Sequence, residues 1–293
     1  MKLLVSIQFF FQSLFDFLIS LLRIGVFTKP SIVYLPSREK RNKQLLILGN
    51  GPSLTNDLKH KTEDFNQYDF LVVNHFAEND LFEQIKPSFY CVGAPELFQD
   101  NAIEELKTKS VQLLQAIYSK TKWPMTLYLN SAALRSEQWI SLLKKNTNIK
   151  LRFFNKTPIE GLFRYFFWRY NVGLPRPHNV LIPSIIIGIN ENYKSIYLFG
   201  ADHSWLKDIA VSNNNEALLN QKHFYDEKTS TAKPMRKDLK GLEARKLHEI
   251  LHKFYLSFKG YHDIDTFSKK YDVIIYNLTT DSFIDAFERK ESC

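Results

Sequence analysis

The sequence predicts an α/β protein built on a doubly wound, mostly parallel β-sheet. From about residue 44 onward, short apolar runs bounded by turn residues alternate with stretches of helical periodicity. A repeated order of strand, helix and strand favours parallel pairing, because each return to the sheet needs a crossover connection. With 293 residues, 44% of them hydrophobic, the chain can bury a large core. This excludes the disordered and collagen-like classes.

The first element is a long apolar segment at the N-terminus. No residue from Leu3 to Phe15 is charged, and apolar character continues to Phe27. On a helix, the polar residues fall in one sector of roughly 140°; they are Gln8, Gln12, Ser13, Asp16, Ser20 and Arg23. A spanning helix would hold Asp16 near the bilayer centre at a cost of about 3 kcal/mol, whereas a helix in the headgroup plane keeps it in water. We therefore predict an amphipathic membrane-associated helix. The alternatives are a spanning helix, and a helix packed on its own domain or on a second subunit.

Basic residues follow this helix and suit an anionic leaflet; they are Lys29, Arg38, Lys40, Arg41 and Lys43. No small-residue cleavage site of a secretory signal follows the apolar run. Residues 1–43 are thus predicted to be a membrane-associating helix with a basic linker, and residues 44–293 a single α/β domain.

The remaining elements follow in order along the chain. We predict strands at 45–48, 70–73, 89–92, 125–129, 151–154, 195–199 and 273–276. We predict helices at 103–118, 136–145, 185–192, 237–258 and 282–289. Three segments fit no regular element and are candidate active-site loops: 175–178, 208–215 and 226–234.

Charge and cysteine content narrow the partners and the compartment. The net charge of +8 favours anionic partners such as nucleotides, nucleic acid or acidic lipid surfaces. Nucleic acid is disfavoured, because the aromatic residues fall in strands and helix cores and do not alternate with basic residues on one face. Two cysteines, Cys91 and Cys293, do not make a disulfide framework, so we expect a protein that faces the cytosol.

The first strand ends directly in Gly49-Asn50-Gly51-Pro52-Ser53-Leu54. Glycines let the backbone turn sharply and approach a ligand, and the amide groups before a helix can hold a phosphate. The turn lacks the third glycine of a dinucleotide-binding loop and the lysine of a Walker loop. The second strand delivers Asn74 to the same crevice, where its amide can bond a base or a ribose. We predict a nucleotide site here; an ordinary tight turn is the alternative.

A second motif, Gly200-Ala201-Asp202-His203-Ser204-Trp205, follows a strongly apolar strand. Asp202 is expected either to accept backbone N–H bonds or to orient an imidazole, and His203 to act as acid, base or phosphate contact. Further along, His223 and Tyr225 precede an irregular charged loop, within a lid expected at about 206–240. A solvated helix end is the alternative for His223.

These motifs resemble the family 42 bacterial sialyltransferases and their wider MptE-like relatives. The matching residues are the turn Gly49–Leu54, Asn74 with Phe76, and the strand and loop Ile196–Asp202; Val273–Phe287 resembles the family's closing strand and helix. The similarity extends over most of Leu45 to Phe287. It implies a single-domain, nucleotide-binding, Rossmann-like fold of the glycosyltransferase A type, with a lid over the site; the N-terminal membrane helix predicted above lies outside this domain. It also implies a CMP-activated sugar donor bound without metal or other cofactor.

The resemblance also implies roles for single residues. The donor-binding set would be Gly49, Asn50, Gly51, Ser53, Asn74 and Ser184. The catalytic set would be His223 as general base, with Tyr225, Asp202 and His203. Ser204 stands where the family has a tyrosine that helps the phosphate leave, so Tyr225 is its expected substitute. Arg176, His178 and His203 are candidates to stabilise the departing phosphate.

The implied reaction is transfer with inversion to a surface-glycan or lipid-carried acceptor. The enzyme would attach peripherally to the cytoplasmic face of the bacterial inner membrane; whether it forms a homo-oligomer stays open.

Other readings of the sequence compete with this one. His248-Glu249-Ile250-Leu251-His252 matches the H-E-x-x-H pattern of zinc hydrolases, although the extended pattern is absent. Asp263-Ile264-Asp265 imitates a metal-holding Asp-x-Asp but follows a helix. An MptE-like pterin diphosphokinase using ATP and magnesium, and a non-catalytic nucleotide-binding membrane protein, are the remaining alternatives.

Overall fold

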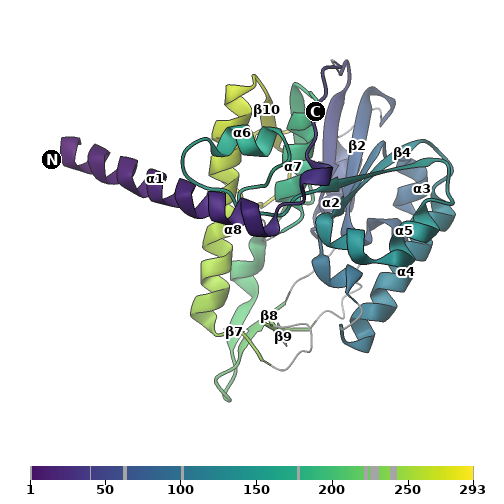
Figure 1. Cartoon of the computed structure of the whole chain (residues 1–293). Coiled ribbons are helices and arrows are strands. Elements are labelled where there is room, and N and C mark those ends of the chain that lie inside the picture. The colour runs from purple at the N-terminus through teal and green to yellow at the C-terminus, as the bar shows by residue number, and fades with distance from the viewer. Residues whose placement is uncertain are drawn as a thin grey trace.

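The computed structural model describes residues 2–39, 41–61, 65–99, 102–176, 179–220, 224, 231–237 and 243–292. An eight-stranded sheet runs through the body of the molecule (Figure 1). In spatial order its strands are β11 (Glu288–Arg289), β10 (Ile274–Asn277), β6 (Ser195–Phe199), β1 (Gln44–Leu48), β2 (Tyr68–Val73), β3 (Phe89–Val92), β4 (Met125–Asn130) and β5 (Ile149–Phe154). Every pairing between these strands is parallel. The predicted α/β fold with a mostly parallel sheet is confirmed, and each predicted strand overlaps an observed one.

Strand order reverses at the centre of this sheet. From β1 the chain builds outward through β2 to β5, and it then returns to the other side of β1 with β6. Leu48 at the end of β1 pairs with Val72 of β2 and with Phe199 of β6. Connections leave such a switch point in opposite directions and open a crevice outside the carboxyl ends of the strands. The two motifs of the sequence follow β1 and β6 and therefore meet here.

Helices cover both faces of the sheet. One face, with Leu45 and Ile47 of β1, packs against α6 (Arg164–Arg169), α7 (Leu181–Asn190) and α8 (Leu247–Lys270). The other face, with Leu46 and Leu48, packs against α2 (Leu54–Lys61), α3 (Leu81–Ile85), α4 (Glu104–Lys120) and α5 (Glu137–Leu143). Successive residues of β1 thus alternate between two cores, as the two-residue period of a strand requires.

The predicted helices at 103–118, 136–145 and 185–192 correspond to α4, α5 and α7, whereas α8 is shifted from its prediction at 237–258. It begins at Leu247 because the Glu249 carboxylate accepts a bond from the Lys246 N–H (2.7 Å), an N-terminal cap. It continues through Gly260, where a Cβ would lie only 3.1 Å from Ile182 of α7. The missing side chain lets the two helices pack closely.

The helix predicted at 282–289 is wrong. These residues form a loop that ends in the short strand β11. Side chains take the carbonyl groups that a helix would use: Asn277 donates to the Ile284 carbonyl (3.2 Å), and Arg289 donates to the Ser282 carbonyl (2.6 Å). Side-chain bonds of this kind hold the backbone in a non-helical path.

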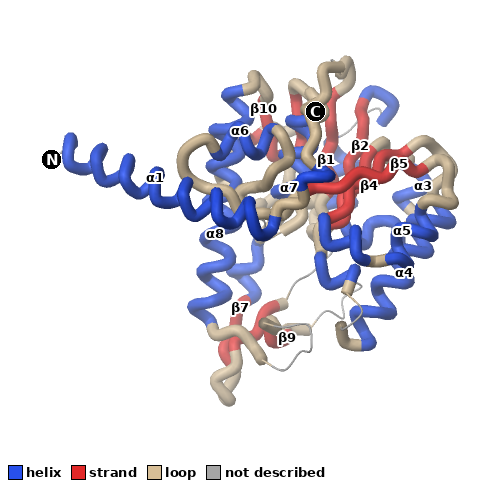
Figure 2. The backbone as a smooth tube through the Cα atoms, in the orientation of Figure 1, coloured by secondary structure: helices blue, strands red, loops and turns tan. Residues whose placement is uncertain are grey.

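A small antiparallel sheet occupies part of the predicted lid. It comprises β7 (Ile209–Val211), β8 (Ala217–Leu219) and β9 (Lys233–Pro234), so the irregular segments predicted at 208–215 and 226–234 both contain strand. Figure 2 shows it apart from the large sheet, beside the N-terminal end of α8. Ala217 and Leu219 pack there on Ile250 and Phe254. Residues 221–223, 225–230 and 238–242 lie outside the description.

The N-terminal helix α1 (Lys2–Phe27) crosses in front of α8 and reaches away from the body at its N-terminal end (Figure 1). Its polar sector, which we expected in water, contacts the protein. The Ser20 hydroxyl accepts a bond from the Glu160 N–H (2.9 Å), and Arg23 pairs with the Glu160 carboxylate (3.3 Å). Gly161, at φ +77°, approaches so closely that a Cβ would lie 2.3 Å from the Ser13 carbonyl oxygen.

The apolar side of α1 consequently faces outward. Its segment Ile7–Phe27 is long and apolar enough to cross a membrane, and the protein buries only 6% of it. The exposed side chains are Ile7, Phe9, Phe10, Phe11, Phe15, Leu18, Leu21, Leu22, Val26 and Phe27. A solvated apolar surface of this extent is rare on a soluble protein and marks an interaction site.

Candidate functional site

The ends of β1 and β6 are held together backbone to backbone. The Gly49 N–H donates to the Phe199 carbonyl and the Gly51 N–H to the Gly200 carbonyl, both at 2.8 Å. A Cβ on Gly49 would lie 2.4 Å from the Gly200 oxygen, and Gly200 itself has φ +59°. Glycine is therefore required on both sides of this contact. The two motifs form one floor.

Asp202 fixes the turn that follows β1. Its carboxylate accepts bonds from the Ser53 N–H (3.2 Å) and the Ser53 hydroxyl (3.0 Å). Burial raises the pKa of Asp202 above its ordinary value, and the two bonds from Ser53 oppose that rise. Of the two roles expected for Asp202, the structure supports the one that organises the loop. The Ser53 hydroxyl, expected at the donor, is directed to this carboxylate.

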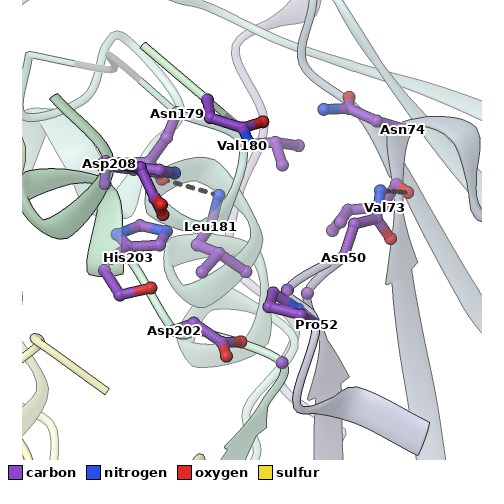
Figure 3. A pocket seen from close by; sticks show the side chains of 16 residues that line it. Asn50, Pro52, Val73, Asn74, Asn179, Val180, Leu181, Asp202, His203 and Asp208 are labelled. Atoms are coloured by element: carbon purple, nitrogen blue, oxygen red, sulfur yellow. Dashed lines mark hydrogen bonds between the residues drawn. The ribbon is translucent and has the colours of Figure 1, made fainter. Parts of the chain in front are cut away.

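A cavity of about 200 Å³ opens above this floor (Figure 3). It lies between the turn after β1, the end of β2, the N-terminus of α7 and the loop after β6. Its lining residues are Gly49, Asn50, Gly51, Pro52, Val73, Asn74, Asn179, Val180, Leu181, Gly200, Asp202, His203, Ser204, Trp205, Asp208 and Asn220. The structure thus brings together Gly49, Asn50, Gly51, Asn74, Asp202 and His203, six of the residues singled out in the sequence.

Four asparagines line this cavity: Asn50, Asn74, Asn179 and Asn220. Asn50 donates to the Val73 carbonyl (3.2 Å), and its Oδ1 is buried without a partner among the described residues. Asn74, held at φ +45°, accepts a bond from the Gly93 N–H through Oδ1 (3.1 Å), and Figure 3 shows its amide nitrogen turned toward the cavity. Asn179 caps α7 by accepting from the Leu181 N–H (3.0 Å), and its Nδ2 is likewise buried without a described partner.

Sequence reasoning missed Asn179, although a signal was present. An asparagine directly before a strongly apolar helix is a typical N-cap, and the N-terminus of α7 lies at the switch point. The Asn179 Oδ1 also accepts a bond from the Tyr261 hydroxyl of α8 (3.0 Å). This carbonyl oxygen therefore has three donors, the Leu181 and Ile182 N–H groups and Tyr261, which fix the amide plane and direct Nδ2.

His203 lines the cavity as a neutral imidazole. It is 8% exposed, and burial lowers its pKa to about 3. Its Nδ1 lies 3.2 Å from the Tyr261 hydroxyl, and its ring stacks on Trp205 at 4.0 Å between centroids. Because the Tyr261 hydroxyl donates to Asn179, His203 donates to Tyr261 through Nδ1. A group with this pKa does not act as a general base at neutral pH.

Several predicted site residues lie elsewhere. Ser184 is fully buried inside α7, where its hydroxyl donates to the Val180 carbonyl (2.8 Å), and it is not among the residues that line the cavity. Arg176 pairs with Glu160 (3.1 Å), beside α1, and does not line the cavity. His178, His223 and Tyr225 lie outside the described residues. Phe224 is described: its N–H donates to the Asn50 carbonyl (2.9 Å), and its ring packs on Phe76.

The residues of the H-E-x-x-H and Asp-x-Asp motifs lie in helix α8, where three of them form a helix cap and ion pairs. Glu249 caps the helix and pairs with Lys237 (3.0 Å), while His248 and His252 are exposed at its surface. Asp263 pairs with Lys259, and Asp265 with Lys269, each four residues away along the helix. In the part of the chain that the structure describes, three or more His, Cys, Asp or Glu side chains are nowhere grouped to hold a metal ion.

Comparison with known proteins gives a distant likeness of fold. No protein-family model matches the chain, and no curated protein matches it. Among solved structures, a similar one is the MAf glycosyltransferase from Magnetospirillum magneticum AMB-1, with a TM-score of 0.49 and 10% sequence identity over 88% of this chain. The match spans only 35% of the length of that protein.

Proposed function

We propose that the protein is a membrane-associated glycosyltransferase, similar to sialyltransferases, that moves a sugar from a CMP-activated donor to a surface-glycan or glycolipid acceptor by metal-independent inversion. The observation that carries the proposal is the ring of asparagine amides at the β1/β6 switch point. Open α/β sheets bind nucleotides at this place. The buried Asn50 Oδ1 and Asn179 Nδ2 offer one acceptor and one donor that no described residue satisfies.

Figure 3 shows Asn50 and Asn179 on opposite sides of the cavity, so the two buried atoms would contact different groups of a bound nucleotide. A carboxamide oxygen accepts and a carboxamide nitrogen donates, and cytosine presents an amino donor and acceptor atoms. A buried polar atom left unpaired costs about 1–3 kcal/mol, so a nucleotide that satisfies either atom gains affinity. The volume of about 200 Å³ is below the roughly 300 Å³ at which small-molecule sites begin. A cavity of this volume suits the cytidine of the donor, and the sugar to be transferred would extend outward.

The charges at the cavity favour one phosphate over three. Among the described residues that line the cavity, none is a lysine or an arginine. A polyphosphate needs such cations more than a single phosphodiester does, because its negative charge increases with each phosphate. A CMP-sugar carries a single phosphodiester at this position, whereas ATP carries a triphosphate. The balance therefore supports the CMP-activated donor over the diphosphokinase alternative.

In the proposed reaction, the acceptor hydroxyl oxygen attacks the anomeric carbon, and the bond from that carbon to the phosphate oxygen breaks. CMP leaves with the electron pair. We assign the acceptor proton to His223 and the stabilisation of the departing phosphate to Tyr225. Phe224, the residue between them, bonds to Asn50, which supports this assignment. Asp202 and His203 act as positioning residues, through Ser53 and Tyr261.

Association with the cytoplasmic face of the inner membrane is part of the proposal. The outward apolar side of α1 would be covered by lipid, and the net charge of +8 suits an anionic leaflet. An acceptor attached to a lipid would then meet the enzyme at the surface to which it adheres.

Nucleotide binding tests the proposal. The full chain is heated with CMP, UDP, GDP or ATP, each with magnesium and with EDTA; a ligand at a hundred times its Kd adds about 2.7 kcal/mol of stability. We expect CMP to stabilise the protein in EDTA. Stabilisation by ATP only with magnesium would instead favour a diphosphokinase, and no response to any nucleotide would contradict the proposal.

One isosteric substitution sharpens this test. Asn179→Asp keeps the oxygen that caps α7 but replaces the buried donor Nδ2 with an acceptor, so CMP stabilisation should be lost while the fold persists. Asn79→Asp is the matched control, because the Asn79 oxygen also accepts a backbone bond, from Leu81 (2.9 Å), outside the cavity. Equal CMP responses in both variants would contradict base recognition by Asn179.

Measurements of sugar transfer distinguish His223, the proposed base, from His248 of the H-E-x-x-H motif. His223→Ala should abolish transfer from a CMP-sugar and leave CMP binding intact, whereas His248→Ala, at the surface of α8, should change neither. A folded His248→Ala protein that alone lost activity would favour the zinc-hydrolase alternative.

A further inference from the structure

Three basic side chains from separate parts of the chain come together near the edge of the sheet where the strands end. Lys156 follows β5 by two residues, Arg245 lies two residues before α8, and Lys253 lies in the second turn of α8. We call these three residues the basic cluster. The charges of Arg245 and Lys156 act on Lys253, and the carboxylate of Glu96, in the turn after β3, acts on both lysines. Three positive charges therefore face a single negative one.

The basic cluster has no partners of its own. Among the described residues, none forms a hydrogen bond or an ion pair with the ammonium group of Lys156 or Lys253. The Nε atom of Arg245 is buried, also without a described partner. All three side chains are half-buried, and burial lowers the pKa of both lysines because the charged form loses hydration. Like charges held together partly out of water destabilise a fold unless an anion compensates them.

The basic cluster borders the nucleotide cavity, although none of its members lines it. On the sheet side, the loop after β3 that carries the opposing carboxylate also carries Gly93, where a Cβ would lie 2.9 Å from Val180 of the cavity lining. On the helix side, Phe254, directly after Lys253, stacks on the lining residue Trp205 at 5.1 Å. The cluster therefore lies on the side of the cavity where the loops after β3 and β5 meet α8.

The side chains of the basic cluster suit an oxyanion. An arginine presents a planar fork of N–H donors that matches a phosphate or a carboxylate, and a lysine adds a point charge with three donors. The single carboxylate of Glu96 leaves most of the positive charge uncompensated. Because the described lining of the cavity holds no lysine or arginine, an acidic group of a substrate is attracted to the cluster beside the cavity.

We propose that Lys156, Arg245 and Lys253 bind a second oxyanion, a phosphate or a carboxylate, that is carried by the acceptor or by the transferred sugar. The oxyanion site stands on the basic cluster alone. Its assignment to a substrate rests on the proposed glycosyltransferase function and narrows the substrates to those with an acidic group beyond the nucleotide.

Thermal unfolding in inorganic phosphate tests the site. The full chain is titrated with phosphate, at an ionic strength held constant with sodium chloride and without nucleotide, and we expect a saturable rise in Tm. Lys253→Met keeps an apolar stem but removes the charge, so it should weaken phosphate binding about tenfold. The same variant should raise the Tm in chloride alone, because the charges of Arg245 and Lys156 on Lys253 outweigh that of Glu96.

Two further variants separate a specific site from general attraction by the net charge. Lys269→Met is the matched control, because it removes the same charge from α8 at a side chain that is 72% exposed; it should leave phosphate binding unchanged. Glu96→Gln removes the opposing carboxylate and should tighten phosphate binding. Equal weakening by Lys253→Met and Lys269→Met would overturn the proposal, and so would a phosphate response that neither Lys253→Met nor Glu96→Gln changes.

Nucleotides identify the source of the oxyanion. Phosphate should still stabilise the protein when CMP is saturating. Competition between phosphate and CMP, or weaker ATP binding by Lys253→Met, would mean that the cluster holds phosphates of the nucleotide itself and would overturn the proposal. The sugar of CMP-N-acetylneuraminate carries a carboxylate. If Lys253→Met weakens its binding more than that of CMP, the oxyanion belongs to the transferred sugar; equal binding of both by the variant assigns it to the acceptor.

The phosphate titration needs no nucleotide, so its failure is distinguishable from failure of the proposed function. Phosphate binding that depends on Lys253, in a protein without any CMP response, would support the oxyanion site and contradict the transferase. A CMP response without such phosphate binding would contradict the oxyanion site and leave the transferase supported.

Discussion

Helices α1 and α7 are both strongly apolar, yet the protein treats them in opposite ways. All ten residues of α7 are buried, and its two polar side chains are satisfied within the protein: Ser184 bonds to the Val180 carbonyl and Asn190 to the Trp168 carbonyl. In α1 the protein contacts the polar sector, through Ser20 and Arg23, and packs on part of the apolar sector, at Phe17 and Ile24. The rest of the apolar sector is exposed. Hydropathy alone does not distinguish these two arrangements. The difference is that the fold buries α7 completely, whereas the described part of the chain leaves most of the apolar side of α1 exposed.

The largest expected effect concerns the outward face of α1. Replacing Phe10, Phe15 and Leu22 together by glutamate should abolish binding to anionic vesicles. Each of these side chains contributes about 1.5–3 kcal/mol when buried, so their sum exceeds a thousandfold in affinity, at about 1.4 kcal/mol per factor of ten. Vesicle flotation measures the loss, and glutamates at Ile103, Val111 and Leu134, exposed elsewhere, form the control. A triple variant that still floats would show that vesicle binding does not depend on this face of α1.

A matched pair of truncations compares the two helices directly. Ile185→Ala in α7 should lower the free energy of unfolding by about 2–5 kcal/mol, because it opens a cavity in the core. Leu18→Ala in α1, at a site 52% exposed, should change it by less than about 0.5 kcal/mol in the absence of lipid. Urea denaturation gives both values. Similar losses in the two variants would mean that α1 is as covered as α7.

The third prediction concerns His203, which is buried near the N-terminus of α7. Its pKa is lowered by burial to about 3 in the folded protein, so the unfolded chain binds a proton first as pH falls. Stability should therefore be complete above pH 6.5 and decrease below it, by roughly 3 kcal/mol at pH 4. His203→Gln should remove this slope. Urea midpoints between pH 7 and pH 4 compare the two proteins, and parallel curves would show that His203 titrates normally.

The smallest effect concerns the hydrogen bond that docks α1 on the α/β domain. Ser20→Ala leaves the Glu160 N–H without its bond to Ser20, at an expected cost of about 1–3 kcal/mol to docking of the helix. Ser119→Ala is the control, because the Ser119 hydroxyl bonds only within its own exposed helix. Hydrogen exchange in α1 should accelerate in the first variant alone. Unchanged exchange would mean that the helix is held well enough by Arg23 and by the bond from the Leu162 N–H to the Ser13 carbonyl (3.3 Å).

Much of this fold was predictable because its signals are local. A buried strand between two turns is a short apolar run, so all seven predicted strands appear. The segment 282–289 failed because Asn277 and Arg289 decide its path by side-chain bonds, which periodicity does not register. The helical periodicity of α1 indicates which of its residues share a face. It does not indicate which face meets the protein, because the partner Glu160 lies 140 residues away from Ser20.

The site was predictable to the same degree. Glycines and polar groups at the ends of β1 and β6 marked its floor, because parallel strands end at a common edge. Ser184 and Asn179 show the limit: they differ by five positions, but only Asn179 stands at the helix end that faces the cavity. Choosing between them required the start of α7, which a continuous apolar run leaves undefined.

The contact between Gly49 and Gly200 has a mechanical consequence. The backbones at Gly49 and Gly200 lie so close that neither position has room for a side chain. Backbone hydrogen bonds across this contact hold the two halves of the sheet together. The amide protons of Gly49 and Gly51 should consequently be among the slowest in the molecule to exchange, released only when the whole domain opens. The floor of the cavity is therefore expected to stay fixed while other parts of the domain fluctuate.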